Sequence, residues 1–458
     1  MPLDKINFEY QSYYVGWWNR PDFPDEKISG TLFIENQKIW IELVFKPSNN
    51  DFPEFIERLD GTTFAINSSK KGSSANIVAE GLSFINYYHL ENGLWYYKFS
   101  VSDIYIYEGA LDKDNINCIC IRANILDKWA AHILEQSYKP VPYEQLPYGH
   151  QLIHYVKPIR YNLLHNTQIS VYLDFVAIRH IDRINQGFKQ KTFCKIVFKG
   201  NTNFQEALEV VNQIQWLFYL LTNRIFHIDY LYSEKGNNTF FYKPNEKVIN
   251  RYIEQFESLE PFTYLSDFSA QEIKSIFQNW IEFYTEFSGG IETYFETLSN
   301  IYTPYSTKIK NFISTIDMLS KDMKGTQGYD TTTKRAKFIE GLITKYNIDK
   351  ADANGLKTRF LKISGEELKS RLTEFINKID KYKPANFESN FEIKIVNTRH
   401  NITHPKANEQ PSYNKNEYKE AAQLLQMLIQ VFLLDAIGVK ESIIRKLISH
   451  PGITATIS

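Results

Sequence analysis

The sequence has little cysteine, and this absence already narrows the class of protein. Only three of its 458 residues are cysteine, at positions 118, 120 and 194. Cys118 and Cys120 alternate within NINCICIRA, a pattern typical of a strand with both sulfurs on one face. We therefore expect buried thiols in a reducing compartment, the cytoplasm, rather than a disulfide framework or a metal site.

Net charge and long apolar runs are also lacking. Lysine and arginine total 52 and aspartate and glutamate total 53, so no global field draws the chain to nucleic acid or to an anionic membrane. Any RNA-binding surface must be local. The N-terminus, MPLDKINFEY, has no apolar signal region, and the longest apolar run, 424–434, is interrupted by Gln426 and Gln430. We expect no membrane association.

Familiar catalytic motifs are missing as well. The sequence has no Walker loop, no glycine-rich dinucleotide fingerprint, no HExxH, no GxSxG and no internal repeat, which disfavours most common enzyme classes. His150, His154, His165 and His180 match no usual zinc spacing. We expect neither a cofactor nor a bound metal.

Aromatic residues are abundant, at 15% of the chain, and they are densest where the pattern is that of strands. Residues 30–36 and 38–45 alternate around a short polar turn, which predicts a hairpin. Residues 94–107 and 115–122 are further predicted strands. After a proline-rich connector at 136–150, two more strands and the amphipathic helix 204–221 follow.

From about residue 262 the pattern becomes helical. Ser269 and Glu272 form a capping box that opens a helix through about Phe287, and Gly289-Gly290 predicts a break. The last long helix, 416–437, is apolar nearly all round, so we expect it to be buried in a bundle and available for a subunit interface. Additional helices are predicted at 291–301, 306–323, 333–345, 364–381 and 441–449.

These patterns predict a multidomain α+β protein. A β-rich N-terminal half with sandwich-like sheets precedes an all-α helical bundle. We place a first β-rich domain at 1–135, a second β-rich part with one amphipathic helix at 136–262, and the helical domain at 263–458.

One predicted helix, in FESNFEIKIVNTRHNITHP from Phe387, ends on two candidate catalytic side chains. Ser389 and Glu392 fit a capping box, and Pro405 stops the helix. Arg399 falls in the last turn and His404 at the exit. They are not on one helical face, but both can reach a common site beyond the helix end, or a site shared with a second copy of the chain.

The same helix has two faces with apolar residues. Phe391, Ile395 and Ile402 fall on the first face, which we expect to turn into a core. Ile393, Val396 and His400 fall on the second. We therefore expect the helix to be covered on two sides.

The Arg-x-x-x-x-His spacing is weak evidence by itself. Histidine is 10 of 458 residues, so a given arginine meets one at a fixed spacing roughly once in 46 cases. The pattern also occurs at Arg160–His165 and at Arg445–His450. The alternative is that Arg399 and His404 only cap a helix C-terminus, where cations are favourable. Only the copy at Arg399 ends a helix that precedes a loop and a long apolar helix.

Two stretches resemble one family. VGWWNRPDFPDEKISGTLFIENQKIWIELVF, from Val15, resembles the opening of the ApeA N-terminal domain, and FEIKIVNTRHNITH before a long apolar helix resembles the catalytic end of the ApeA-type HEPN domain. The resemblance covers most of the chain and is loosest at 136–260 and 326–355. It implies an antiphage defence protein with a metal-independent endoribonuclease and a possible phage-derived trigger, usually a homodimer. It makes Arg399 and His404 the motif residues and places His400 where the family often has Asn, Asp or His.

Those residue types suit RNA transesterification. Histidine takes or gives a proton near neutral pH, and arginine offers a permanent charge with fork geometry for phosphate. Two copies of His404 in a dimer would supply an acid and a base. One alternative is a non-catalytic HEPN protein that binds RNA or a partner. Another is a carbohydrate- or peptide-binding β-sandwich on a helical scaffold, which exposed aromatic residues in one groove would favour.

Overall fold

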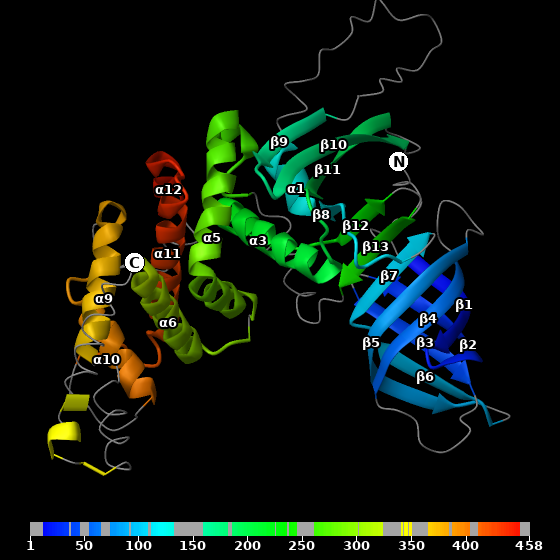
Figure 1. Ribbon diagram of the computed structural model, residues 1–458, viewed down its shortest axis with the longest axis horizontal. Helices are drawn as coiled ribbons and strands as arrows, with labels where there is room; N and C mark the ends of the chain where they lie inside the picture. The colour runs from blue at the N-terminus through cyan, green and yellow to red at the C-terminus, as the bar shows by residue number, and fades with distance from the viewer. Residues whose placement is uncertain are drawn as a thin grey trace, which may run out of the picture. The chain divides into compact units, whose positions relative to one another are not determined.

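The computed structural model describes most of the chain in two compact units, Met1–Lys274 and Ser275–Ser458. Figure 1 shows the strands of the first unit in blue to green and the helices of the second in green to red. The described residues are 12–35, 38–45, 55–65, 74–90, 93–108, 111–131, 159–181, 186–224, 226–235, 238–244, 261–300, 302–323, 340–341, 343–346, 348–349, 365–383, 387–403 and 411–448.

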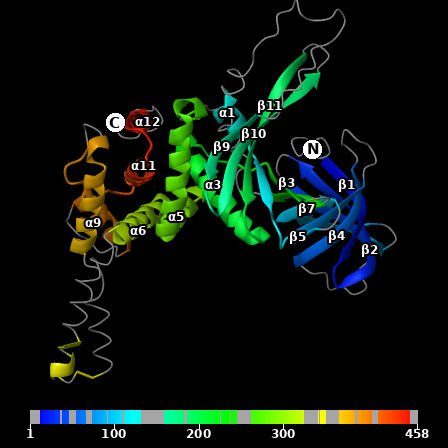
Figure 2. The same cartoon turned by 45° about the horizontal axis from the view of Figure 1, so that its top comes forward.

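Six antiparallel strands of the first unit close into a barrel in the order β4-β1-β2-β3-β6-β5, with β5 pairing back onto β4 (the blue strands of Figures 1 and 2). The predicted hairpin is confirmed, because β2 pairs with β3 from Ser29–Val44 to Glu35–Lys38. The predicted sheets are therefore present, closed into a barrel. The strands are β1 (Ser12–Arg20), β2 (Phe23–Glu35), β3 (Lys38–Phe45), β4 (Phe55–Ala65), β5 (Ser74–His89) and β6 (Trp95–Ser100).

Alternation along these strands fills the barrel with apolar side chains. Leu32, Ile41 and Phe99 are fully buried inside it. Trp18 is also fully buried, and its ring lies so close to Gly61 that a Cβ there would come within 2.6 Å of it. Trp17, the next residue toward the N-terminus, points to the other side of the strand and is 55% exposed.

Seven more strands continue the sheet from β5 in the order β7-β13-β12-β8-β11-β10-β9. The core of the barrel continues among them through side chains such as Phe193, Tyr232 and Phe241. All three cysteines are buried, and burial raises the pKa of the Cys194 thiol. The strands are β7 (Asp103–Glu108), β8 (Cys118–Arg122), β9 (Ile159–His165), β10 (Ile169–Ile181), β11 (Gln186–Phe198), β12 (Tyr230–Lys235) and β13 (Asn238–Pro244).

Three helical segments accompany this second set of strands: α1 (Asn124–Trp129), α3 (Phe204–Thr222) and the short 3-10 helix η4 (Leu265–Asp267). A capping box of Asn203 and Glu206 starts α3, and its buried face includes Leu217 and Phe218. The predicted helix 204–221 is confirmed. The division of this unit into domains at residue 135 stays a prediction.

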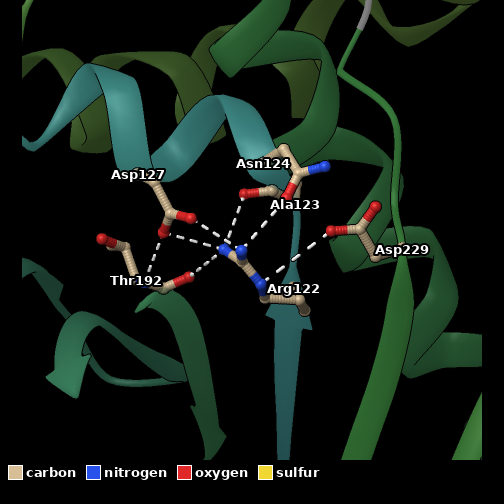
Figure 3. A network of polar contacts seen from close by, with 6 residues as sticks. All are labelled: Arg122, Ala123, Asn124, Asp127, Thr192 and Asp229. Carbon is tan, nitrogen blue, oxygen red and sulfur yellow. Dashed lines mark hydrogen bonds and ion pairs between the residues drawn. The ribbon is translucent and has the colours of Figure 1, made fainter. Parts of the chain in front are cut away.

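A buried arginine joins four parts of the first unit (Figure 3). Arg122, at the end of β8, has no exposed surface and donates to both carboxylate oxygens of Asp127 in α1, at 2.8 and 2.6 Å. It also donates to the carbonyl oxygens of Ala123 and of Thr192 in β11, while Asp229, just before β12, lies 3.9 Å away. No spacing pattern in the sequence indicated this ion-pair network.

The second unit is a bundle of helices. The predicted capping box at Ser269 is confirmed: its hydroxyl accepts from the Glu272 N–H and its own N–H donates to the Glu272 carboxylate. The expected break appears as a kink at Phe287. The elements are α5 (Ala270–Ser299), α6 (Tyr305–Met323), α9 (Gly365–Lys378), η6 (Asp380–Tyr382), α10 (Phe391–Thr403), α11 (Tyr418–Ala436) and α12 (Glu441–Ile448).

Helix α11 is the centre of this bundle, as its apolar sequence predicts. Eleven of its residues, among them Leu425, Ile429 and Leu433, are buried. Gly438, with a φ of 84°, follows the end of α11 and stops the helix from continuing. Because the chain itself buries most of α11, little of this helix is left for the subunit interface that the sequence suggested, and that interface stays a prediction. The predicted helix 333–345 lies largely outside the described residues.

Candidate functional site

Helix α10 carries the candidate site, and its start differs slightly from the prediction. It begins at Phe391, and the N–H of Lys394 donates to the carbonyl oxygen of Asn390. Asn390 therefore occupies the N-cap position that the sequence assigned to Ser389. The last helical residue is Thr403, so His400 lies in the last turn, and Arg399 lies one residue before it rather than in the last turn as predicted.

The core face of α10 holds the helix in the bundle. Phe391, Ile395 and Thr398 are fully buried, and Ile402 is half-buried. The expectation that the apolar residues of this face turn into a core is confirmed. Thr398 is polar, but its hydroxyl donates to the Lys394 carbonyl oxygen and accepts the Tyr413 N–H, so it is satisfied in the core.

A second face of α10, which we call the clamp, binds the segment that precedes α11. The Asn397 amide donates to the Pro411 carbonyl oxygen at 2.9 Å, and the Asn401 amide donates to the Ser412 hydroxyl at 3.0 Å. These two asparagines are one helical turn apart and lie on either side of Arg399 in the sequence. The clamp therefore fixes residues 411–413 along the same two turns that carry Arg399.

At the N-terminal end of α10, an ion pair also holds the segment before α11, and we count it as part of the clamp. Glu388 accepts the Tyr413 hydroxyl at 2.8 Å and pairs with Lys394, whose ammonium also lies over the Tyr413 ring. Burial alone would raise the pKa of the Glu388 carboxyl, but hydrogen bonds from Lys394 and Tyr413 outweigh it, and the pKa is lowered overall. Burial, and then the bond to Glu388, raises the pKa of Tyr413.

The outer face of α10 presents Ile393, Val396, Arg399, His400 and Thr403. Ile393 is 38% exposed, and Arg399, His400 and Thr403 are exposed, so the chain by itself does not cover this face, although the sequence predicted that it would. The described residues contain no carboxylate paired with the Arg399 guanidinium. His404 and Pro405 lie outside the described residues, so the structure describes Arg399 and His400 of the three predicted site residues.

The other two copies of the arginine–histidine spacing are in different surroundings. Arg160 lies in β9 and donates to both carboxylate oxygens of Asp174, at 2.8 and 3.0 Å, while His165 bonds the Ser170 hydroxyl. Arg445 in α12 pairs with Glu441 and donates to the Lys381 carbonyl oxygen, and His450 lies outside the described residues. Both arginines form ion pairs within the fold. The guanidinium of Arg399, by contrast, lies on an exposed face of its helix.

The clamp gives a testable stability effect. Tyr413→Phe removes one hydrogen bond to a carboxylate, and we expect it to lower the free energy of unfolding by about 1–2 kcal/mol at pH 7. Because the folded-state pKa of Glu388 is lowered, the contribution of the bond is present above the unfolded pKa and is lost as the pH falls through the folded one. Urea denaturation at neutral and acidic pH measures this, with Tyr302→Phe, at a tyrosine 73% exposed, as control. Equal losses at both pH values would contradict the ionic character of the bond.

In the parts of the chain that the structure describes, no three histidine, cysteine or acidic side chains are gathered so as to hold a metal ion. None of the described helices is long and apolar enough to cross a bilayer.

The comparisons with known proteins agree with this architecture. The model of the family described as ApeA N-terminal domain 1 matches residues 13–282, more than half of the chain, and that of the Apea-like HEPN family matches residues 310–443, which include α10 and α11. No curated protein and no solved structure gave a significant match. The fold and the matched regions define a β-barrel protein with a C-terminal HEPN domain. The chain belongs to the ApeA family, as the two resembling stretches suggested.

Proposed function

We propose that the chain is a metal-independent endoribonuclease of an antiphage, abortive-infection defence system. One observation carries the proposal: inside the HEPN match, the C-terminal part of α10 carries an exposed Arg399 next to His400, and His404 is the first residue after the helix in the sequence. HEPN domains are generally associated with nucleases. The two other arginines with the same spacing are held by carboxylates, which supports the choice of this copy.

The proposed chemistry needs three groups around one phosphate. A base removes the proton of the 2′-hydroxyl, which attacks the phosphorus, and an acid protonates the departing 5′-oxygen. His404 serves as base or acid, and Arg399 stabilises the negative charge that develops on the phosphorane oxygens. His400 lies in the next position of the same exposed turn and is a candidate to bind the substrate phosphate.

The proposal includes a homodimer. One chain offers one Arg399 and one His404, whereas transesterification uses an acid and a base besides charge stabilisation. The outer face of α10 joins apolar Ile393 and Val396 to Arg399 and His400, so a two-fold axis beside it would bury the apolar pair and bring two motifs together. With α11 already buried, this face is the better candidate for the interface. The β-rich unit acts in the proposal as sensor or regulator.

The product ends test the reaction. We expect total cellular RNA incubated with the full chain in excess EDTA to be cut, leaving a 2′,3′-cyclic phosphate or 3′-phosphate and a 5′-hydroxyl, because the attacking group is the 2′-oxygen. The new 5′ ends should accept phosphate from a kinase without prior dephosphorylation. Ends that already carry 5′-phosphate, or cleavage that EDTA stops, would contradict the mechanism. RNA binding without cleavage under every condition, including phage infection of expressing cells, would favour a non-catalytic HEPN protein.

A further inference from the structure

The C-terminal part of α10, which carries Arg399, is held in the bundle by little apolar burial. Ile395 and Thr398 are fully buried, whereas none of residues 399–403 is, and Ile402, half-buried, is their only apolar side chain. The last carbonyl groups of a helix also lack partners within it, so such an end tends to fray. The core alone therefore does not fix the place of Arg399.

Two asparagine side chains supply the missing attachment. The Asn397 amide donates to the Pro411 carbonyl oxygen at 2.9 Å, and the Asn401 amide donates to the Ser412 hydroxyl at 3.0 Å. One asparagine precedes Arg399 by two residues and the other follows it by two. At about 100° per residue, both project about 160° away from Arg399 around the helix axis. They therefore do not share a phosphate with its guanidinium, and they act on it only through the backbone.

The segment that receives these two bonds is itself well anchored. The Tyr413 N–H donates to the Thr398 hydroxyl at 2.8 Å, and the Tyr413 hydroxyl donates to Glu388 at 2.8 Å. Shortly afterwards the chain enters α11, which has eleven buried residues. The two asparagines thus tie the exposed end of α10 to a rigid part of the bundle, which is what a preorganised site requires.

We propose that Asn397 and Asn401 are positioning residues of the ribonuclease site. They hold the turn that carries Arg399, so that its guanidinium stays where the phosphorane charge develops, and they do not touch the substrate themselves. This role rests on the proposed function, because the position of Arg399 matters to catalysis only if Arg399 takes part in it. A displacement of about 1 Å is enough to slow a reaction about 100-fold.

Cleavage of a labelled RNA by the full chain tests this role. We expect Asn397→Ala combined with Asn401→Ala to lower kcat about 10–100-fold while KM changes less than about threefold, because the charge is misplaced at the transition state and the rest of the RNA still binds. In an Arg399→Ala chain the same two substitutions should lower the rate less than about twofold, since the side chain that they position is already gone. Equal effects in both backgrounds would overturn the role.

Ser412→Ala gives a second route that leaves α10 itself unaltered. It removes the acceptor of the Asn401 amide and should also slow cleavage. Ser412→Thr keeps a hydroxyl in that place and should keep the rate. This pair of variants decides the question even where the asparagine variants do not fold.

The matched controls are Asn279→Ala and Asn311→Ala, in α5 and α6. The Asn279 amide donates to the Ile437 carbonyl oxygen and the Asn311 amide to the Thr297 hydroxyl, both at 3.1 Å. Each control therefore loses the same kind of hydrogen bond as one of the positioning residues, but elsewhere in the bundle. Both should keep the kcat of the unmodified chain.

Hydrogen exchange detects the displacement without a cleavage assay. In the double asparagine variant, the amide hydrogens of residues 399–403 should exchange at least about tenfold faster, while those of residues 391–395 stay protected. The role is refuted if exchange at the helix end is unchanged, if the controls slow cleavage as much, or if Ser412→Thr behaves like Ser412→Ala. If Arg399→Ala itself leaves cleavage unchanged, the proposed ribonuclease site fails and the positioning role fails with it, even where faster exchange shows that the asparagines hold the helix end.

Discussion

Arg399→Ala is expected to slow RNA cleavage by about 10²–10³-fold while leaving the stability of the chain unchanged. The size of this rate decrease follows from the loss of a preorganised charge at the transition state. The intact stability follows from the place of the side chain: it is on the outer face of α10, and the core and clamp faces hold the helix without it. His404→Ala should cost about 10²–10⁴-fold, the usual contribution of a general acid or base. Cleavage rates with a labelled RNA, beside urea denaturation of each variant, measure both quantities.

The other two copies of the spacing are the controls for that experiment. Arg160→Ala and Arg445→Ala each remove a surface ion pair and should leave the cleavage rate unchanged. If one of them abolishes cleavage and Arg399→Ala does not, the site has been assigned to the wrong copy. Arg399→Lys should recover only part of the rate, because an ammonium group keeps the charge but loses the fork that matches a phosphate.

Mixing the two inactive chains tests whether the site is shared. In a composite site, a dimer of one Arg399→Ala chain and one His404→Ala chain holds one arginine and one histidine, half of the set, so mixing should not restore full activity. Activity should also fall together with dimer content on dilution. A monomer that keeps full specific activity would rule out the shared site and leave the single-chain arrangement.

Local patterns in the sequence predicted the elements well where partners are close in the chain. The alternation of residues 30–45 predicts the β2–β3 hairpin, and Ser269 with Glu272 predicts the start of α5. Residues 94–107, by contrast, were predicted as one strand but form β6 and β7. The split occurs where the Val101 N–H bonds Ile39 and the Ser102 N–H bonds Glu80, residues from two distant strands. Alternation does not reveal such long-range partners, and it fits a sandwich as well as a barrel.

The candidate site was predictable only in those features that depend on residues close together in the chain. Spacing and a helix end suggested Arg399 and His404, and the apolar residues of α10 indicated its core face. The clamp was not foreseen, because Asn397 and Asn401 acquire their role only from residues 411–412, which the fold brings back onto the helix. The burial of α11 likewise depends on the helices around it, so an all-round apolar sequence did not distinguish a bundle core from a subunit interface.

Arg122→Ala is expected to have the largest effect on stability, about 3–5 kcal/mol. The variant removes the charge from a network in which both neighbouring carboxylates are largely shielded from water: the side chains of Asp127 and Asp229 keep only 19% and 11% exposure. It also removes donors to the Ala123 and Thr192 carbonyl oxygens. The cost is that of leaving carboxylates buried without compensation, and it exceeds the net worth of the intact pair.

Arg160→Ala is the matched control, because Arg160 makes the same two-pronged contact with Asp174 but has a side chain 52% exposed. Asp174 is itself only 13% exposed, but the guanidinium that covers it lies at the surface. Water therefore reaches the carboxylate once the arginine is removed, and the expected cost is only about 0–1 kcal/mol. Arg122→Lys should remain strongly destabilised, since one ammonium group does not replace a planar fork that donates to both oxygens of Asp127, to the Asn124 side chain and to two carbonyl oxygens. Replacing both Arg122 and Asp127 by apolar residues should cost less than Arg122→Ala alone, because no carboxylate of the direct pair is left behind. Urea denaturation, together with hydrogen exchange of peptides that cover β8 and β11, measures these differences. Equal losses for Arg122→Ala and Arg160→Ala would mean that burial does not govern the strength of these ion pairs.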